Sequence, residues 1–356
     1  MTVAGRPLPE RSGQMFLPRR LLLPLAVVTA AIALVGVINL ALPHATQAAA
    51  FVVTKTADTN DGECSADDCS LREAVVTANA AAGPDTITVP PGTYTLTLAG
   101  AGEEAAATGD LDITDDVTII GFDTRQTIID GNAADRVFEL NAGVTAAIER
   151  FWVRNGSAPN GGGIQNAGNL TLSDVLVREN AAGSSTTAKG GGVANSGTLV
   201  LLSSEVELNT TTGSGGGLNN TGEMTLTDST ERQNAADVSG GGINQSSGGS
   251  LTISGSTISE NTAGSAAVGG GGILADGGTV TITLSTIRGN SATKNGGGIN
   301  VGQNATISIT DSTLDTNTAN DGGDGDTILW IGISLAITAL VALAAWRVER
   351  SIRPKA

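Results

Sequence analysis

The chain has 356 residues, of which 49 are glycine and only 3% are aromatic, so a globular core built on Phe, Tyr and Trp is not expected. Residues 51–326 hold 11 basic against 33 acidic residues, a formal charge of −22, which excludes nucleic acid and anionic lipid as partners of that region. One histidine, in the N-terminal segment, and two cysteines exclude histidine catalysis and a zinc or cysteine-rich scaffold, so we assign no catalytic residue, metal ligand or cofactor.

Residues 1–50 have the pattern of a secretory signal. Arg19 and Arg20 precede an apolar run from Leu21 to Leu42, and the small-residue stretch 48–50 follows it. A basic head, an apolar run and an A-x-A-like site are typical of a signal peptide, for which we predict cleavage after Ala50. Because the run is long for a signal core, an uncleaved N-terminal anchor is the alternative.

Residues 51–84 predict an N-terminal cap that contains a helix. Ser70 and Glu73 have the spacing of a capping box, in which each side chain bonds the other's backbone N–H. The following apolar residues share one helical face: Leu71, Ala74, Val75 and Ala78. We expect this helix to cover the open end of the structure that follows.

Two cysteines lie in the same cap. Cys64 and Cys69 are close in sequence in a chain that we expect to be exported. Disulfides persist in such oxidising compartments, so we predict a Cys64–Cys69 disulfide, with two free thiols as the alternative.

Residues 85–320 form a repeat array. Glycine triplets, each followed by one aliphatic residue, occur at 161–163, 190–192, 215–217, 240–242, 270–272 and 296–298. A second series runs in step with them at intervals of 25 to 29: Asn155, Asn180, Asn209, Asn234, Asn261, Asn290 and Asn317. A repeat of this length indicates a solenoid.

The segments between the glycines and the asparagines alternate polar and β-branched residues with period 2, which predicts strands. Short strands with one coil per repeat predict an all-β fold, a right-handed parallel β-helix. An inward asparagine at a turn can bond the asparagines of adjacent coils and turn backbone. We therefore interpret the seven asparagines as a structural ladder.

The C-terminal segment resembles a membrane anchor. After an acidic spacer at 321–326, residues 327–346 are apolar over the length that spans a bilayer as a helix, with Trp330 and Trp346 near its ends. The basic tail 347–356 predicts a cytoplasmic C-terminus by the positive-inside rule. Aspartates in the spacer (DGGDGD) resemble one imperfect copy of a glycine–aspartate calcium repeat, but we favour the interpretation of a flexible acidic spacer.

The stretch CSADDCSLREA at 64–74, followed by ITVPPGTYTLT, resembles the CSLREA-motif region of bacterial exported right-handed parallel β-helix proteins. The glycine–asparagine repeat is similar to the repeats of polymorphic outer-membrane proteins. The resemblance implies a pectin-lyase-like β-helix at the cell surface and says little about activity. The chain departs from the outer-membrane family in ending with one apolar run and in lacking the Phe before the repeat Asn.

These features favour a cell-surface protein anchored in the membrane by its C-terminal helix, adhesin-like or structural, with a surface polysaccharide or another cell-surface protein as partner. The alternative is a polysaccharide lyase or glycosidase of the same fold. Its candidate residues are Asp110 and Asp112 with Asp115 and Asp116, and Arg125 and Arg136 downstream. We interpret Asp115 and Asp116 as turn residues before a strand. An enzyme requires acidic and basic residues from different coils to converge in one cleft.

Overall fold

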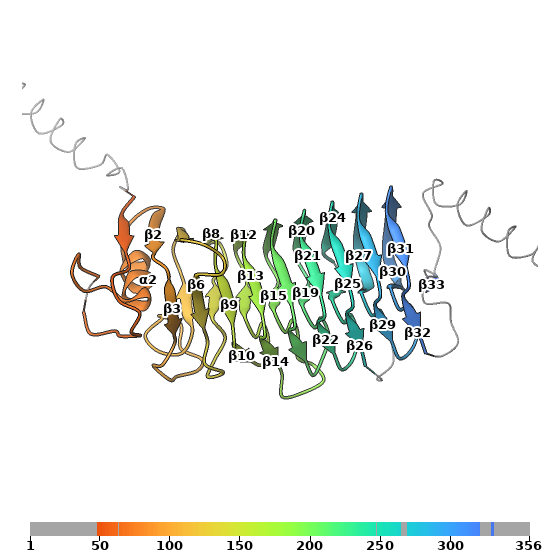
Figure 1. Cartoon of the computed structure of the whole chain (residues 1–356), viewed down its shortest axis with the longest axis horizontal. Helices are drawn as coiled ribbons and strands as arrows, with labels where there is room; N and C mark the ends of the chain where they lie inside the picture. Colours follow the sequence, from red (N-terminus) through yellow and green to blue (C-terminus); the bar gives the residue numbers. More distant parts are fainter. Residues whose placement is uncertain (1–47, 63, 247, 265–268, 321–328, 331–356) are drawn as a thin grey trace, which may run out of the picture. The chain divides into compact units, whose positions relative to one another are not determined.

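The computed structural model describes residues 48–62, 64–246, 248–264, 269–320 and 329–330. These residues form a stack of coils whose strands fall into three sheets running along the stack (Figure 1). The strands pair in parallel with strands one coil away, so that repeat positions stand beside each other. The fold is thus an all-β parallel β-solenoid, as the repeat pattern predicted.

Sheet A has 17 strands. In the first half of each coil they are β4 (Leu111–Ile113), β7 (Phe138–Leu140), β11 (Ile164–Asn166), β15 (Val193–Asn195), β19 (Leu218–Asn220) and β23 (Ile243–Gln245). In the second half they are β1 (Ala50–Val52), β2 (Asp85–Val89), β5 (Val117–Gly121), β8 (Thr145–Glu149), β12 (Asn169–Ser173), β16 (Thr198–Leu202), β20 (Glu223–Thr227) and β24 (Ser250–Ser254). Both halves are continuous in β27 (Ile273–Thr283) and β30 (Ile299–Thr310), and β33 (Leu329–Trp330) pairs with β30.

Sheet B has nine strands and sheet C has seven. Sheet B comprises β3 (Gly92–Thr95), β6 (Thr127–Asp130), β9 (Trp152–Arg154), β13 (Leu176–Arg178), β17 (Glu205–Glu207), β21 (Thr230–Arg232), β25 (Thr257–Ser259), β28 (Thr286–Arg288) and β31 (Thr313–Asp315). Sheet C comprises β10 (Ser157–Ala158), β14 (Ala181–Ala182), β18 (Thr210–Thr211), β22 (Ala235–Ala236), β26 (Thr262–Ala263), β29 (Ser291–Ala292) and β32 (Thr318–Ala319).

Rows of aliphatic side chains fill the interior of the stack. The residue after each glycine triplet points inward and is buried, and these residues stand in register: Ile164, Val193, Leu218, Ile243, Ile273 and Ile299. Because each side chain packs on its counterpart one strand spacing away, the core needs few aromatic rings.

Each glycine triplet meets three separate steric demands. Gly161 has φ +59°, a left-handed conformation that glycine adopts without strain. A Cβ on Gly162 would lie 2.2 Å from the carbonyl oxygen of Ala181 in the next coil. A Cβ on Gly163 would lie 3.0 Å from the amide carbon of Asn180. The glycine and asparagine series recur together because the asparagine side chain lies against the third glycine.

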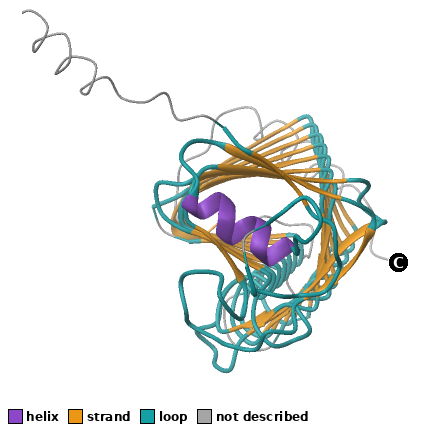
Figure 2. Cartoon of the chain, turned by 90° about the vertical axis from the view of Figure 1, so that its left-hand side faces the viewer, coloured by secondary structure: helices purple, strands orange, loops and turns teal. Residues whose placement is uncertain are grey.

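Helix α2 (Leu71–Ala80) lies across the N-terminal end of the stack (Figure 2). Its apolar face is buried. Ser70 is the N-cap, and its side chain accepts from the backbone N–H of Glu73 at 3.1 Å. Glu73 in turn accepts from the backbone N–H of Ser70 at 2.8 Å. The helix therefore has a complete capping box and covers the strand edges of the first coils.

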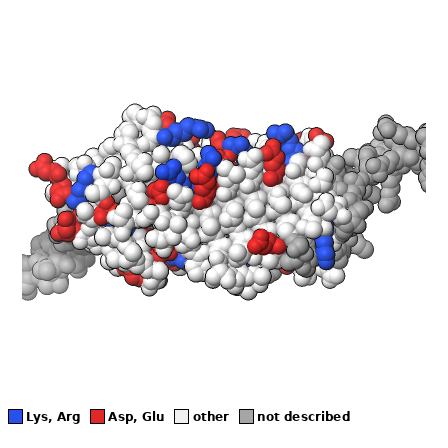
Figure 3. All heavy atoms as spheres, turned by 60° about the horizontal axis from the view of Figure 1, so that its bottom comes forward, with Lys and Arg blue, Asp and Glu red and all other residues white. Residues whose placement is uncertain are grey.

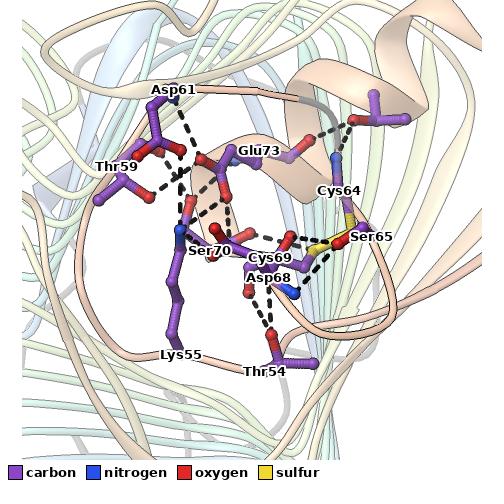
Figure 4. The surroundings of a disulfide bond; sticks show 11 residues. Thr54, Lys55, Thr59, Asp61, Cys64, Ser65, Asp68, Cys69, Ser70 and Glu73 are labelled. Carbon is purple, nitrogen blue, oxygen red and sulfur yellow. Dashed lines mark hydrogen bonds and ion pairs between the residues drawn. A yellow bond between two sulfur atoms is a disulfide. The ribbon is translucent and has the colours of Figure 1, made fainter.

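The cap also contains the predicted disulfide between Cys64 and Cys69, whose Cα atoms are 4.3 Å apart. Figure 4 shows the hydrogen bonds that converge beside it on Glu73, which also accepts from the Thr59 hydroxyl and the Asp61 backbone N–H. Burial alone would raise the pKa of Glu73, but these bonds hold it at about 2.

Arg72 joins the cap to the first coils. Its side chain is fully buried, and Nε lies 2.7 Å from Asp58. Its two terminal nitrogens donate to backbone carbonyls of Ala106, Gly109 and Asp110, in the loop 96–110 between β3 and β4. A buried guanidinium is thus fully paired, and it fixes the end of that loop.

The membrane predictions fall mostly outside the described residues. The signal region is undescribed up to residue 47, and Ala50, the last residue of the predicted signal, begins β1. Spacer 321–326 and tail 347–356 also lie outside the described residues. Of the predicted membrane helix, only Leu329–Trp330 is described, and these two residues are extended rather than helical. Within the described ranges, no helix has the length and apolarity needed to cross a bilayer.

Candidate functional site

Six of the seven predicted ladder asparagines form one continuous stack: Asn180, Asn209, Asn234, Asn261, Asn290 and Asn317. All are buried. The Oδ1 atom of each of the last five accepts from both the backbone N–H and the Nδ2 of the asparagine in the preceding coil. Each Nδ2 also donates to a backbone carbonyl, such as Val206 for Asn234 at 2.9 Å. The stack satisfies turn backbone that the sheets leave unpaired.

Asn155 does not belong to this stack, which corrects the ladder proposed from sequence. Strand pairing places Asn155 beside Glu179 and places Gly156 beside Asn180. Asn155 has φ +52° and Glu179 has φ +59°, so both occupy the left-handed corner that precedes the ladder position. The Asn155 side chain instead donates to Asp130 at 3.0 Å.

A second internal polar row, which the sequence analysis missed, lies three residues after the third glycine of four successive triplets. Asn166, Asn195, Asn220 and Gln245 are buried, and the amide of each asparagine donates to the side-chain oxygen of the next residue in the row at 2.6 to 2.7 Å. The sequence signal is an Asn or Gln at this fixed distance from each glycine triplet. Both rows are structural, because their polar atoms face the interior.

The outer face of sheet B carries a row of basic and acidic side chains, the arginine–carboxylate row. It consists of Asp130, Arg154, Arg178, Glu207 and Arg232 on five successive strands. Arg154 Nε donates to Asp130 at 2.9 Å, Arg178 Nη1 lies 3.3 Å from Glu207, and Arg232 also pairs with Glu207. Figure 3 shows basic and acidic side chains interleaved along one strip of the surface.

Trp152 lies beside this row on β9. The guanidinium carbon of Arg154 is 4.9 Å from the centre of the indole, and that of Arg178 is 5.7 Å away. Both distances are within the range of a cation–π contact. Two guanidinium groups on adjacent strands repel each other, and the ring and the flanking carboxylates offset this repulsion. We call Trp152, Arg154 and Arg178 the Trp152 platform.

A small cavity opens next to the platform. Leu176 stands beside Trp152 in the neighbouring strand, and Glu205 beside Leu176. The cavity has a volume of about 80 Å³ and is lined by Thr124, Arg125, Asp174, Val175, Leu176, Ser203 and Glu205. This volume is well below that of a typical small-molecule pocket. Together with the platform, it provides hydroxyl, carboxylate and guanidinium groups beside one aromatic ring.

The acidic residues singled out in the sequence separate into two groups. Asp116 Oδ1 accepts from Thr145 N at 2.7 Å and Asp115 Oδ1 from Asp116 N, so both serve a turn before β5. Asp110 and Asp112, by contrast, lie together with Arg136. Arg125 is in neither group, because it lines the cavity beside sheet B.

The Asp110–Asp112 group is closed by the loop 96–110. Both side chains are at most 1% exposed, and Ala106 N donates to Asp112 Oδ2 at 2.7 Å. Burial raises the pKa of Asp110 to about 7, with a further increase from Asp112, against the opposing effect of Arg136. Burial likewise raises the pKa of Asp112 to about 6, despite the Ala106 hydrogen bond. Acidic and basic residues from different coils thus converge here, but beneath a loop.

No protein-family model matches this sequence, and no curated protein matches it. Among solved structures, the chain is similar to the A-module of the Azotobacter vinelandii mannuronan C-5 epimerase AlgE6, with 18% sequence identity and a TM-score of 0.41. The alignment covers 68% of this chain and 75% of that chain. The function proposed below therefore rests on the residues of this chain.

Proposed function

We propose that this chain is a membrane-anchored, extracytoplasmic right-handed β-helix that binds a surface polysaccharide in an adhesin-like role, through the outer face of sheet B around the Trp152 platform. The signal-like and anchor-like terminal segments support export and anchoring, and the CSLREA resemblance supports a cell-surface setting. The observation that carries the proposal is the aromatic ring flanked by fixed guanidinium groups and a hydroxyl-lined cavity.

This chemistry suits a sugar chain. The C–H face or edge of a sugar ring packs against an aromatic side chain, while its hydroxyls bond to charged groups. Arg154 uses only Nε in the hydrogen bonds shown here, which leaves the two Nη groups for a ligand. The charges of the row are paired within it, so they hold their positions before a ligand arrives.

The solenoid favours a polymer over a single sugar. Sheet B repeats along the stack at the strand spacing of about 4.8 Å, and its strands pair side by side from β3 to β31. A polysaccharide can therefore lie along successive coils and gain many weak contacts.

The test is binding of the full-length protein, in detergent solution, to an array of purified polysaccharides. We expect Trp152→Ala and Arg178→Ala each to weaken binding about tenfold, the equivalent of about 1.4 kcal/mol. The matched control is Arg288→Ala, an exposed arginine on the same outer row of sheet B with no ring contact. Equal losses for all three variants, or binding only to another cell-surface protein, would refute the assignment of this face to glycan.

The lyase or glycosidase alternative would use Asp110, Asp112 and Arg136. A polymer cannot reach these carboxylates while loop 96–110 covers them. We therefore expect the protein to leave polygalacturonate intact with or without calcium. Release of unsaturated products that is lost in Asp112→Asn would favour the enzyme instead.

A further inference from the structure

The Asp110–Asp112 group contains more negative charge than its protein neighbours offset. Strand pairing places Asp112 beside Glu139, and carboxylate oxygens of Asp110, Asp112 and Glu139 lie within 4.8 Å of one another. Buried Asp135 adds a fourth carboxylate close enough to interact with Asp110. Among the described residues, only the Arg136 guanidinium forms an ion pair with this group, because Arg72 bonds the backbone of Asp110 and pairs its charge with Asp58.

Arg136 reaches only part of the group. Its Nη1 lies 3.1 Å from Asp110 and bonds Glu139. The second oxygen of Glu139 accepts from Gln165 at 2.8 Å. Among the described residues, no arginine bond reaches Asp112, and its buried Oδ1 has no hydrogen-bond partner.

A fully buried carboxylate oxygen without a partner is unusual in a folded protein, because burial removes the water that would otherwise solvate it. Asp112 is 0% exposed, and one of its carboxylate oxygens lies within 4.8 Å of oxygens of two other carboxylates. This independent observation indicates that a cation belongs among them.

We propose that Asp110, Asp112 and Glu139 bind one calcium ion, which fastens the loop 96–110 over the first coils. The ligands are all carboxylate oxygens, which hard divalent cations prefer. Calcium accepts irregular oxygen coordination at 2.3–2.6 Å, whereas magnesium requires a near-ideal octahedron, which two strand residues and one residue at the end of a loop do not supply. The acidic surface of the solenoid attracts such a cation towards the site.

The role of the ion is structural. Two sets of hydrogen bonds already hold the loop. Arg72 of the cap donates to the carbonyls of Gly109 and Asp110, and the backbone N–H of Ala106 donates to the Asp112 carboxylate. A calcium ion on Asp112 would reinforce the second attachment. Glu104 is exposed in this loop, so the rate of proteolytic cleavage after Glu104 can report how firmly the loop is held.

The experiment is calcium titration of the EDTA-treated full-length protein by isothermal calorimetry, together with digestion by a glutamate-specific protease. We expect one calcium per chain and at least tenfold slower cleavage after Glu104 when calcium is present. Asp112→Asn and Glu139→Gln should lose both effects. Asp276→Asn, which changes an exposed acid of sheet A, should retain both.

A further variant separates loss of the site from loss of the fold. Arg136→Gln removes a positive charge beside the ion and should bind calcium several-fold more tightly than the wild-type protein. If the wild-type protein shows no saturable binding, the proposal is wrong. The same holds if calcium binds Asp112→Asn and Glu139→Gln unchanged, or if Arg136→Gln binds more weakly than wild type.

Discussion

A glutamate in the hydrophobic core makes the stability of this solenoid depend on pH. Glu231 points inward on β21, between Val206 and Ile258 of the adjacent coils, and is 0% exposed. Its Oε1 accepts from Asn234 at 2.8 Å, and its Oε2 is buried without a partner. Burial raises the pKa of Glu231 well above its ordinary value, because the surrounding core disfavours the charged form.

The sign of the effect follows from proton binding. Between the unfolded pKa of about 4.3 and the raised folded pKa, the folded state binds one more proton at this site than the unfolded state. The free energy of unfolding therefore falls as pH rises through that window, by about 1.4 kcal/mol per pH unit at full slope. Below about pH 4.3, Glu231 is protonated in both states and burying it carries no ionisation penalty.

Glu231→Gln tests this reasoning directly. Glutamine keeps the shape and an acceptor for Asn234 but binds no proton, so the variant should match wild type near pH 4 and exceed it by a margin that grows with pH. Glu231→Val should be more stable than wild type throughout the neutral range, because Val206 already fills the same position one coil earlier.

The measurement is the urea midpoint of the full-length protein at unit intervals from pH 4 to pH 8. Midpoints are compared directly, because a solenoid can unfold in more than one step. Glu223→Gln, at an exposed glutamate, is the control and should leave the pH dependence unchanged. If wild type and Glu231→Gln show parallel pH profiles, Glu231 is not protonated in the folded core and the argument fails.

Three further predictions concern the ladder, the cap and the membrane orientation. Asn234→Ala should lower the free energy of unfolding by about 1–3 kcal/mol, because it leaves buried amides unpaired. The control, Asn169→Ala at an exposed position, should change it by less than about 0.5 kcal/mol. Equal urea midpoints for the two variants would contradict this prediction. Glu73→Ala should lower the free energy of unfolding by about 1–3 kcal/mol at pH 7. The stabilisation by Glu73 should be lost as pH falls from about 4.3 towards about 2, because the folded state holds its pKa at about 2. An unchanged thermal midpoint at pH 7 would count against this prediction. Protease added to intact cells should remove residues 51–326 and spare the tail 347–356; a protected middle would reverse the proposed orientation.

The periodic part of the fold could be predicted because each coil repeats the same contacts. The glycine triplet and the buried asparagine constrain each other sterically, so their shared period locates every coil from residue 161 onward. The error at Asn155 arose where the motif shifts by one residue. In the sequence RNGS, the asparagine takes the left-handed corner and Gly156 takes the ladder position, which only strand pairing reveals.

The candidate sites were less accessible to sequence reasoning. Asp112 and Glu139 are neighbours only because β4 and β7 pair, and the irregular loop 96–110 hides that register. Trp152 stands near Arg178 for the same reason, since one coil separates them in sequence. The burial of Glu231 has no local sequence signal either. A charged residue in a short strand is expected to point outward, and only strand pairing shows that Glu231 takes the inward position held by Val206 and Ile258 in the adjacent coils.

The corner between sheets C and A has a consequence for how such a protein can lengthen. The coil from Asn180 to Asn209 is four residues longer than the coil from Asn209 to Asn234, and the excess lies at 183–188, after the shared strand pairs of sheet C. The extra residues leave the strand pairings on both sides of this corner unchanged. A duplicated coil would find the same partners on both sides, so gene duplication could extend the protein in whole-coil steps, and this corner is the natural place to display a foreign peptide.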